Sequence, residues 1–253
     1  MYTPELGRAI ELAKEAGKLQ LSGRNTPLSF EQKEDASPVT AVDKACEELI
    51  RRSLRLSFPD DSFLGEENGL SNGTSGRCWI VDPIDGTRPF IRGIPTYSTL
   101  IALETDGKPV VGVIHLPELA ITCWAAAGEG AYLNGRRIRV SETDSLDKSM
   151  GSALGFVEHG NTTLRGKLLD FMRRWDYAYG FMDAYSYVCL ASGKLDCCIN
   201  LLDKPWDCAA AACIATEAGG VFSDIHGTAS VHNGTFVLSN GILHDEIIHH
   251  FAR

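Results

Sequence analysis

An apolar run in the first half of the chain is followed directly by two aspartates. This short segment restricts both the fold that the chain can adopt and the chemistry that it can perform. Residues 79–87 read Trp-Ile-Val-Asp-Pro-Ile-Asp-Gly-Thr. The apolar residues predict a buried strand that ends near Val81, because Pro83 has no N–H with which to continue a paired ladder. Asp82 and Asp85 would then lie at a rigid corner, where two carboxylates repel each other unless a cation lies between them. Hard oxygen ligands favour Mg²⁺ or Mn²⁺, so the run predicts a metal site rather than an ordinary Asp-Gly turn.

Length and charge restrict the class of protein. At 253 residues the chain can bury one large core or two modest ones. Its net charge of -9 argues against nucleic acid or an anionic membrane as a partner. An acidic protein that acts on a phosphorylated substrate needs metal ions to offset the repulsion locally. No apolar run is long enough for a membrane span, and no signal peptide is expected at the N-terminus.

The cysteines favour a cytoplasmic location. Most of the eight lie in apolar stretches and are expected to be small core residues, as at Cys46 and Cys213. No Cys-x-x-Cys pair occurs, so neither a zinc ribbon nor a thioredoxin-like motif is expected. The adjacent Cys197 and Cys198 should point to opposite faces of a strand.

The N-terminal half is expected to pack helices on an antiparallel sheet. A helix should begin near Thr3 and end in the glycine, asparagine and proline cluster at 23–27, and a second should begin near Thr40 with Asp43 in its first turn. A short strand should end at Leu64. Further strands are expected at 96–103, 109–116 and 121–126, followed by a hairpin at Asn134-Gly135.

The C-terminal half has a different order of expected strands and helices. The polar segment 141–149 is the expected junction between an N-terminal α+β domain, residues 1–145, and a C-terminal α/β domain, residues 146–253. Strands and helices should alternate beyond it, which favours parallel pairing. The expected elements are a strand at 152–156, a helix at 163–174, a strand near Tyr177, a helix at 183–192, a strand at 195–199 and a helix that opens at Trp206-Asp207.

Three motifs in this order resemble those of the inositol monophosphatase superfamily. They are Gly65-Glu66-Glu67, the run from Asp82 to Thr87, and Trp206-Asp207 with Glu217-Ala218-Gly219-Gly220 after it. The resemblance implies an α/β (α+β) fold, a layered αβαβα sandwich shared with fructose-bisphosphatases. It also implies a lithium-sensitive phosphatase that uses two or three Mg²⁺ ions per site, with Mn²⁺ as an alternative. A homodimer is implied as well.

The resemblance assigns the metal ligands. Glu66, Asp82 and the backbone carbonyl of Ile84 would hold the first metal, and Asp82 would bridge to a second metal completed by Asp85 and Asp207. Two hard cations can clamp the attacking and leaving oxygens of an in-line displacement. Taken alone, Asp207 would be interpreted as an ordinary helix-start residue.

The same resemblance assigns the catalytic residues. Thr87 would orient the attacking water, and Asp43 would accept a hydrogen bond from the Thr87 hydroxyl. Glu66 is counted among the catalytic residues because it would be a ligand of the first metal. The backbone N–H groups of Gly86 and Thr87 would bind the phosphate, since a glycine permits close approach.

Two other interpretations compete with this mechanism. Haloacid-dehalogenase-type enzymes use Asp-x-Asp-Gly-Thr with an aspartate nucleophile, but here two residues separate Asp82 and Asp85. That spacing favours direct attack by water. If the protein were a non-catalytic regulator with the same fold, at least one of the expected metal ligands would be missing from the sequence. None of them is missing.

The substrate signal is weaker and favours histidinol phosphate. The run Asp183-Ala184-Tyr185-Ser186-Tyr187 and the Lys-Pro-Trp-Asp at 204–207 are similar to that branch of the family. Asp183 could pair with an amine, or it could merely cap a helix. Asn200 stands where both main branches commonly carry an acid that contacts substrate. Substrate contacts are therefore expected from Gly86, Thr87, Asp183, Asn200 and Asp207, while inositol phosphate or a broad range of sugar phosphates and nucleotides stays an alternative.

Overall fold

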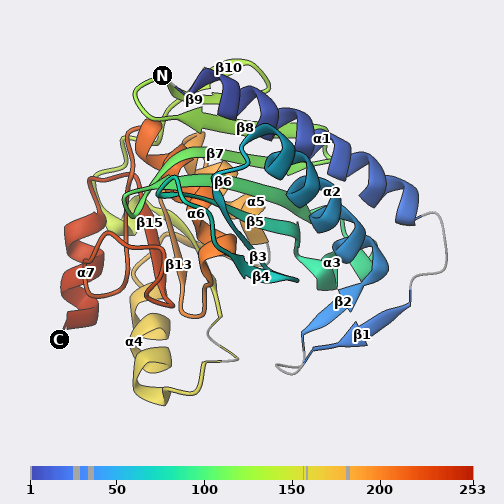
Figure 1. The fold of residues 1–253 in the computed structure, drawn as a ribbon. Helices are drawn as coiled ribbons and strands as arrows, with labels where there is room; N and C mark the ends of the chain where they lie inside the picture. Colours follow the sequence, from blue (N-terminus) through green and yellow to red (C-terminus); the bar gives the residue numbers. More distant parts are fainter. Residues whose placement is uncertain are drawn as a thin grey trace.

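The computed structural model describes residues 2–24, 29–33, 37–155, 157, 159–180 and 183–252. Within these ranges, none of the helices combines the length and the apolar character needed to cross a membrane. The described chain forms five layers that alternate between helices and sheets (Figure 1). The expected αβαβα arrangement is confirmed.

The outer helical layer covers one face of the larger sheet. It consists of α1 (Thr3–Arg24) and α2 (Ala41–Ser57), which lie side by side in Figure 1. Residues such as Leu12, Ile50 and Trp79 form the core between this layer and the sheet. A short hairpin of β1 (Phe30–Gln32) and β2 (Pro38–Thr40) precedes α2.

The larger sheet has eight strands in the order β10-β9-β8-β7-β6-β5-β3-β4. All neighbours are antiparallel except β3 and β5, which are parallel. The expected strands and the hairpin at Asn134-Gly135 are present, with small shifts at their ends. Their bounds are β3 Ser62–Gly65, β4 Gly69–Ser71, β5 Arg77–Asp85, β6 Ser98–Thr105, β7 Lys108–Leu116, β8 Ile121–Ala126, β9 Gly130–Leu133 and β10 Arg136–Ile138, with α3 (Thr87–Arg92) directly after β5.

One expectation about β5 was wrong. The strand does not end near Val81 but continues through Pro83 to Asp85. Its pairing with β6 is irregular there, because Asp82 faces Leu100 and Asp85 faces Ser98, which leaves two residues opposite one. The proline therefore produces a bulge instead of the end of the strand.

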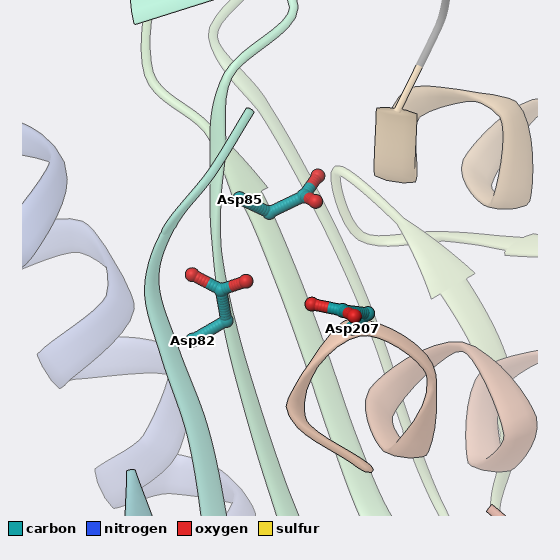
Figure 2. Close-up of side chains that lie close together, drawn as sticks. All are labelled: Asp82, Asp85 and Asp207. Atoms are coloured by element: carbon teal, nitrogen blue, oxygen red, sulfur yellow. The ribbon is translucent and has the colours of Figure 1, made fainter. Parts of the chain in front are cut away.

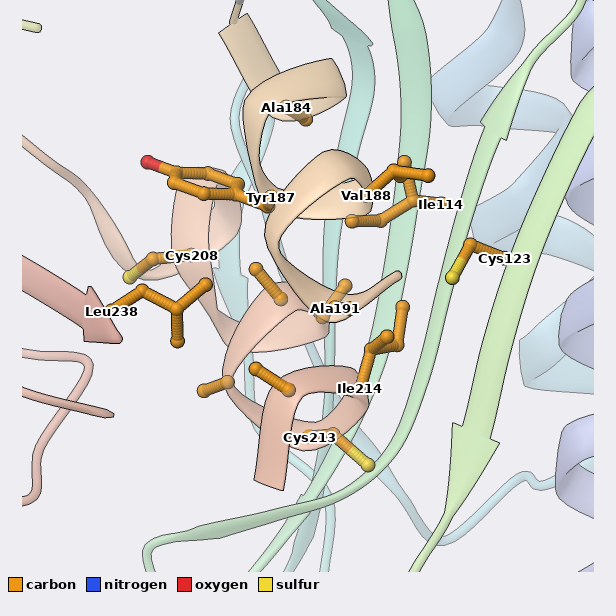
Figure 3. Packing of buried hydrophobic residues seen from close by; sticks show 14 of the residues in the cluster. Ile114, Cys123, Ala184, Tyr187, Val188, Ala191, Cys208, Cys213, Ile214 and Leu238 are labelled. Carbon is orange, nitrogen blue, oxygen red and sulfur yellow. The ribbon is translucent and has the colours of Figure 1, made fainter. Parts of the chain in front are cut away.

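The middle helical layer lies between the two sheets. It contains α5 (Asp183–Ala191) and α6 (Pro205–Glu217), which pack against each other and against the larger sheet (Figure 3). One core joins residues of both halves of the chain, such as Ile114, Val188 and Leu238. The division into domains 1–145 and 146–253 stays a prediction.

The smaller sheet has five strands in the order β12-β11-β13-β15-β14 and is backed by α4 (Thr162–Met172) and α7 (His244–Ala252). Only its first two pairings are parallel; β15 is antiparallel to both neighbours, so parallel pairing is less extensive than expected. Cys197 and Cys198 point into different cores on opposite faces, as predicted. The bounds are β11 Met150–Leu154, β12 Tyr177–Tyr179, β13 Cys197–Asn200, β14 Val221–Ser223 and β15 Phe236–Ser239, with a 3-10 turn at Leu146–Lys148 before β11.

The contact between α6 and β7 leaves no room for a side chain at Gly112. A methyl group there would lie 2.4 Å from the Ala210 carbonyl oxygen. We expect Gly112→Ala to lower the free energy of unfolding by about 1–3 kcal/mol, because the helix must move off the sheet. The matched control is Gly7→Ala in α1, where a methyl group meets nothing within 4 Å and should stabilise by up to about 1 kcal/mol. Urea titration of both variants measures the difference; equal stability would contradict the close packing of α6.

Candidate active site

The bulge in β5 is held in place by buried polar groups. The Pro83 carbonyl, which has left the regular ladder, accepts hydrogen bonds from Gln20 Nε2 at 2.7 Å and Thr99 Oγ1 at 3.1 Å. Gln20 is completely buried and comes from α1. Its role was not predicted from the sequence, although a glutamine on the apolar face of a helix is itself a signal, because a buried amide requires partners.

The bulge directs two carboxylates toward a third from α6. Asp82, Asp85 and Asp207 each offer a carboxylate oxygen within 4.8 Å of the others (Figure 2). Asp82 Oδ1 is buried and has no hydrogen-bond partner among the described residues. A buried carboxylate oxygen without a donor is costly, and a hard cation at this point would satisfy it. The residues present therefore fit a Mg²⁺ site.

The electrostatics of the three aspartates agree with such a site. Burial raises the pKa of Asp82 well above its ordinary value, and the nearby carboxylates of Glu66, Asp85 and Asp207 raise it further. Burial is likewise the main cause of the raised pKa of Asp85 and of Asp207. Without a cation, the folded protein thus favours the protonated forms of these groups.

Asp207 is both a helix-start residue and a member of the cluster. Its Oδ2 accepts a hydrogen bond from the Lys204 N–H at 2.7 Å, as in a capping box. Asp85 is fixed in a similar way, because its Oδ2 accepts hydrogen bonds from the Ala184 N–H at 2.8 Å and the Ser98 hydroxyl at 3.2 Å. Each carboxylate is therefore oriented by hydrogen bonds to one of its two oxygens.

Asp43 and Thr87 form the expected pair. The Thr87 hydroxyl lies 3.2 Å from Asp43 Oδ1 and 3.2 Å from the Ile84 carbonyl oxygen, so it can donate to either. Asp43 is completely buried in the first turn of α2, where its Oδ2 accepts hydrogen bonds from the N–H and hydroxyl of Thr40. Burial raises the pKa of the Asp43 carboxyl.

Glu66 is positioned by a buried acid that was not singled out from the sequence. Glu47, from α2, accepts hydrogen bonds from the N–H groups of Glu67 and Asn68, each at 2.8 Å. Its carboxylate also lies against Gly65, where a methyl group would approach it to 2.5 Å. The Lys33 ammonium group lies 2.7 Å from a carboxylate oxygen of both Glu66 and Glu67. In this arrangement a lysine partly neutralises the acids beside the aspartate cluster.

Gly86 joins β5 to α3 in the left-handed region, with φ of +79°. A β-carbon there would be strained by the backbone and would also approach Asp183 Oδ2 to 3.2 Å. Glycine is therefore required at this corner, consistent with the predicted close approach of a phosphate to the backbone of Gly86 and Thr87.

A cleft of about 320 Å³ opens beside the aspartate cluster. Asp183 lines it with φ of +36°, which is strained for a residue other than glycine. Its side chain accepts a hydrogen bond from the Thr96 hydroxyl at 3.5 Å, and burial raises its pKa. Tyr187 also lines the cleft, whereas Tyr185 packs against the core.

The wall of the cleft also carries an acid that was not predicted. Asp203 lines the cleft together with Asn200 and is only 4% exposed. Burial raises the pKa of Asp203 to about 8. The acid that was expected at position 200 is thus absent there, but another carboxylate lies three residues further along the same wall.

The structure brings every predicted site residue to this region, while their individual roles stay predictions.

Comparison with known proteins agrees with the motifs. Residues 2–253 match the sequence model of the inositol monophosphatase family. A histidinol-phosphatase of Mycobacterium tuberculosis is 39% identical over 98% of each chain, and inositol monophosphatase 1 of Solanum lycopersicum is 36% identical over 88% of this chain and 85% of its own length. The crystal structure of extragenic suppressor protein suhB from Bartonella henselae superposes with a TM-score of 0.92, at 28% identity and with 99% of both chains covered.

The raised pKa values predict how the stability of the metal-free protein depends on pH. A carboxyl whose pKa is raised by folding holds its proton more tightly in the folded state, so the free energy of unfolding falls as pH rises from about 4 toward about 8. In chelator, the midpoint of thermal unfolding should therefore drop between pH 5.5 and pH 8.5 by on the order of 5 °C. Mg²⁺ should restore more stability at pH 8.5 than at pH 5.5.

Asp85→Asn serves as the control for this experiment, since it removes one of the repelling charges. The variant should show a weaker dependence on pH and a smaller effect of Mg²⁺. A metal-free protein that becomes more stable as pH rises through this window would contradict the assigned repulsion among the buried acids.

Proposed function

The chain belongs to the inositol monophosphatase family and is a phosphoric monoester hydrolase, and we propose that its substrate is histidinol phosphate and its cofactor Mg²⁺. The observation that carries this proposal is the juxtaposition of the aspartate cluster with a cleft that has a further carboxylate, Asp183, on its wall. A phosphate would be held at the cluster, and an ammonium group on the same substrate would find an acid beside it.

The metal would be held by Glu66, Asp82, Asp85, Asp207 and the Ile84 carbonyl. Two or three Mg²⁺ ions, when bound there, supply the positive charge that offsets the phosphate and the charge that develops during an in-line displacement. The uncompensated Asp82 Oδ1 supports this assignment. From the family resemblance we also propose a homodimer in the cytoplasm.

The chain's own residues would orient the nucleophile. The Thr87 hydroxyl would donate its hydrogen bond to Asp43, so that a lone pair of the hydroxyl oxygen could accept a hydrogen bond from an attacking water. Asp43 has its second oxygen fixed by Thr40, so the pair is held rigidly before substrate binds. The backbone at Gly86 and Thr87 would hold the phosphate in line with that water.

Inositol phosphate is the second candidate substrate. It is favoured by the similarity to an inositol monophosphatase over most of the chain. The acids on the cleft wall argue against it, because a neutral polyol offers no positive charge to Asp183. A neutral polyol would leave that partly desolvated carboxylate unpaired.

The substrate assignment is tested with a panel of phosphate esters. Purified protein is assayed for phosphate release from histidinol phosphate, inositol 1-phosphate and adenosine 3′,5′-bisphosphate in the presence of Mg²⁺. We expect the highest kcat/KM with histidinol phosphate, loss of all activity in excess chelator and recovery on addition of Mg²⁺. A preference for inositol 1-phosphate would favour the second candidate, and full activity in chelator would refute the metal assignment.

The role of Thr87 is tested by removing its hydroxyl. Thr87→Ala should lower kcat by about 100-fold or more with a much smaller change in KM, because the water loses its orientation while the phosphate keeps its contacts. Thr87→Ser, which keeps the hydroxyl, should retain most of the activity. A single turnover in H₂¹⁸O should place the label in phosphate and none in the protein; a phosphate trapped on Asp82 or Asp85 would overturn direct attack by water.

A further inference from the structure

Asp203 is a buried carboxylate on the cleft wall to which the proposed mechanism gives no role. It lies between β13 and α6, and its backbone N–H donates a hydrogen bond to the Gly234 carbonyl at 3.1 Å. The loop that carries it is therefore fixed by a second segment of the chain. The side chain is 4% exposed and still lines the cleft.

Two neutral side chains hold this carboxylate. The Tyr187 hydroxyl donates to Asp203 Oδ2 at 3.1 Å, and Asn200 Nδ2 donates to Oδ1. Each oxygen of a carboxylate can accept two hydrogen bonds, so one site on each remains. No ion pair within the described ranges of the chain includes Asp203. Neutral donors alone compensate only part of the hydration that a buried carboxylate loses, so Asp203 holds its proton more tightly in the free protein, and a cation beside it would favour the ionised form.

Asn200 supports Asp203 with its side-chain amide. Its Oδ1 accepts a hydrogen bond from the Leu202 N–H at 3.1 Å, while its Nδ2 is directed at the Asp203 carboxylate. An acid at position 200 would repel Asp203, whereas the amide stabilises it. The contacts of Asn200 therefore indicate a support for the neighbouring carboxylate, and the Asn200 side chain also lines the cleft.

The charges on the cleft wall are unbalanced. Among the residues that the structure describes, four carboxylates line the cleft, at Asp85, Asp183, Asp203 and Asp207, together with one guanidinium group, at Arg88. Asp85 and Asp207 belong to the aspartate cluster. Asp183 and Asp203 thus add negative charge on the substrate side, and a protonated nitrogen in the cleft would offset it.

We infer that Asp203 is a specificity-determining residue whose carboxylate pairs with a protonated nitrogen of the substrate, and that Asn200 and Tyr187 position it. The inference rests on the proposed function, because histidinol phosphate carries an ammonium group and a basic imidazole in addition to its phosphate. A phosphorylated polyol would make no such pair. Asp203 then discriminates between the two candidate substrates without contacting the reacting phosphorus.

The test is a ratio measured on one enzyme preparation. The kcat/KM for histidinol phosphate is divided by that for inositol 1-phosphate, so that any loss of folded protein cancels. Asp203→Asn should lower this ratio by about 10- to 100-fold, because the substrate nitrogen loses its charged partner. The exchange variant Asn200→Asp/Asp203→Asn returns a carboxylate to the same wall with unchanged net charge, and it should recover a large part of the ratio.

Asp196→Asn is the matched control, since it removes another buried acid that does not line the cleft and should leave the ratio unchanged. If the wild-type protein prefers histidinol phosphate and Asp203→Asn keeps that preference, the inference is wrong while the proposed function stands. The inference is also wrong if the exchange variant is as impaired as Asp203→Asn. If the wild-type protein shows no preference, the proposed function fails and the inference fails with it.

Discussion

Repulsion among buried carboxylates is the constraint on which the rest of this structure depends. Asp82, Asp85 and Asp207 lie within 4.8 Å of one another in a largely desolvated corner. Such an arrangement is unfavourable for a folded chain unless cations or protons occupy it. The protein tolerates it because several apolar cores between the sheets and the helical layers stabilise the rest of the fold.

The orientation of these acids comes from hydrogen bonds that cross between distant elements. Gln20 from α1 holds the bulge in β5, Glu47 from α2 holds the segment that carries Glu66, and the first turn of α5 holds Asp85 through the Ala184 N–H. Each bond is buried or partly buried, so losing one would leave a polar group without a partner. Catalytic geometry and fold stability are therefore coupled through the same few contacts.

We propose that substrate choice depends on a different set of contacts. The cleft wall carries Asp183 in a strained left-handed conformation, and Asp203 supported by Asn200 and Tyr187. Strain and burial of charge both cost stability, and they are retained where they serve function. The aspartate cluster is suited to metal ions that would hold a phosphate, and we propose that these wall residues distinguish what is attached to the phosphate.

The sequence alone predicted most strands and helices and the aspartate motifs, because periodicity, turn residues and local spacing act over short distances, and the layers were predicted from the resemblance of those motifs to a known family. It failed where distant segments decide the outcome. Pro83 produced a bulge and not a strand end, since Gln20 and Thr99 satisfy its carbonyl. Position 200 was interpreted as lacking an expected acid, whereas the structure shows a carboxylate nearby at Asp203 that is held by Tyr187 from α5. Only the tertiary structure could decide these points, because the energy of a buried polar group depends on partners that lie far away in the sequence.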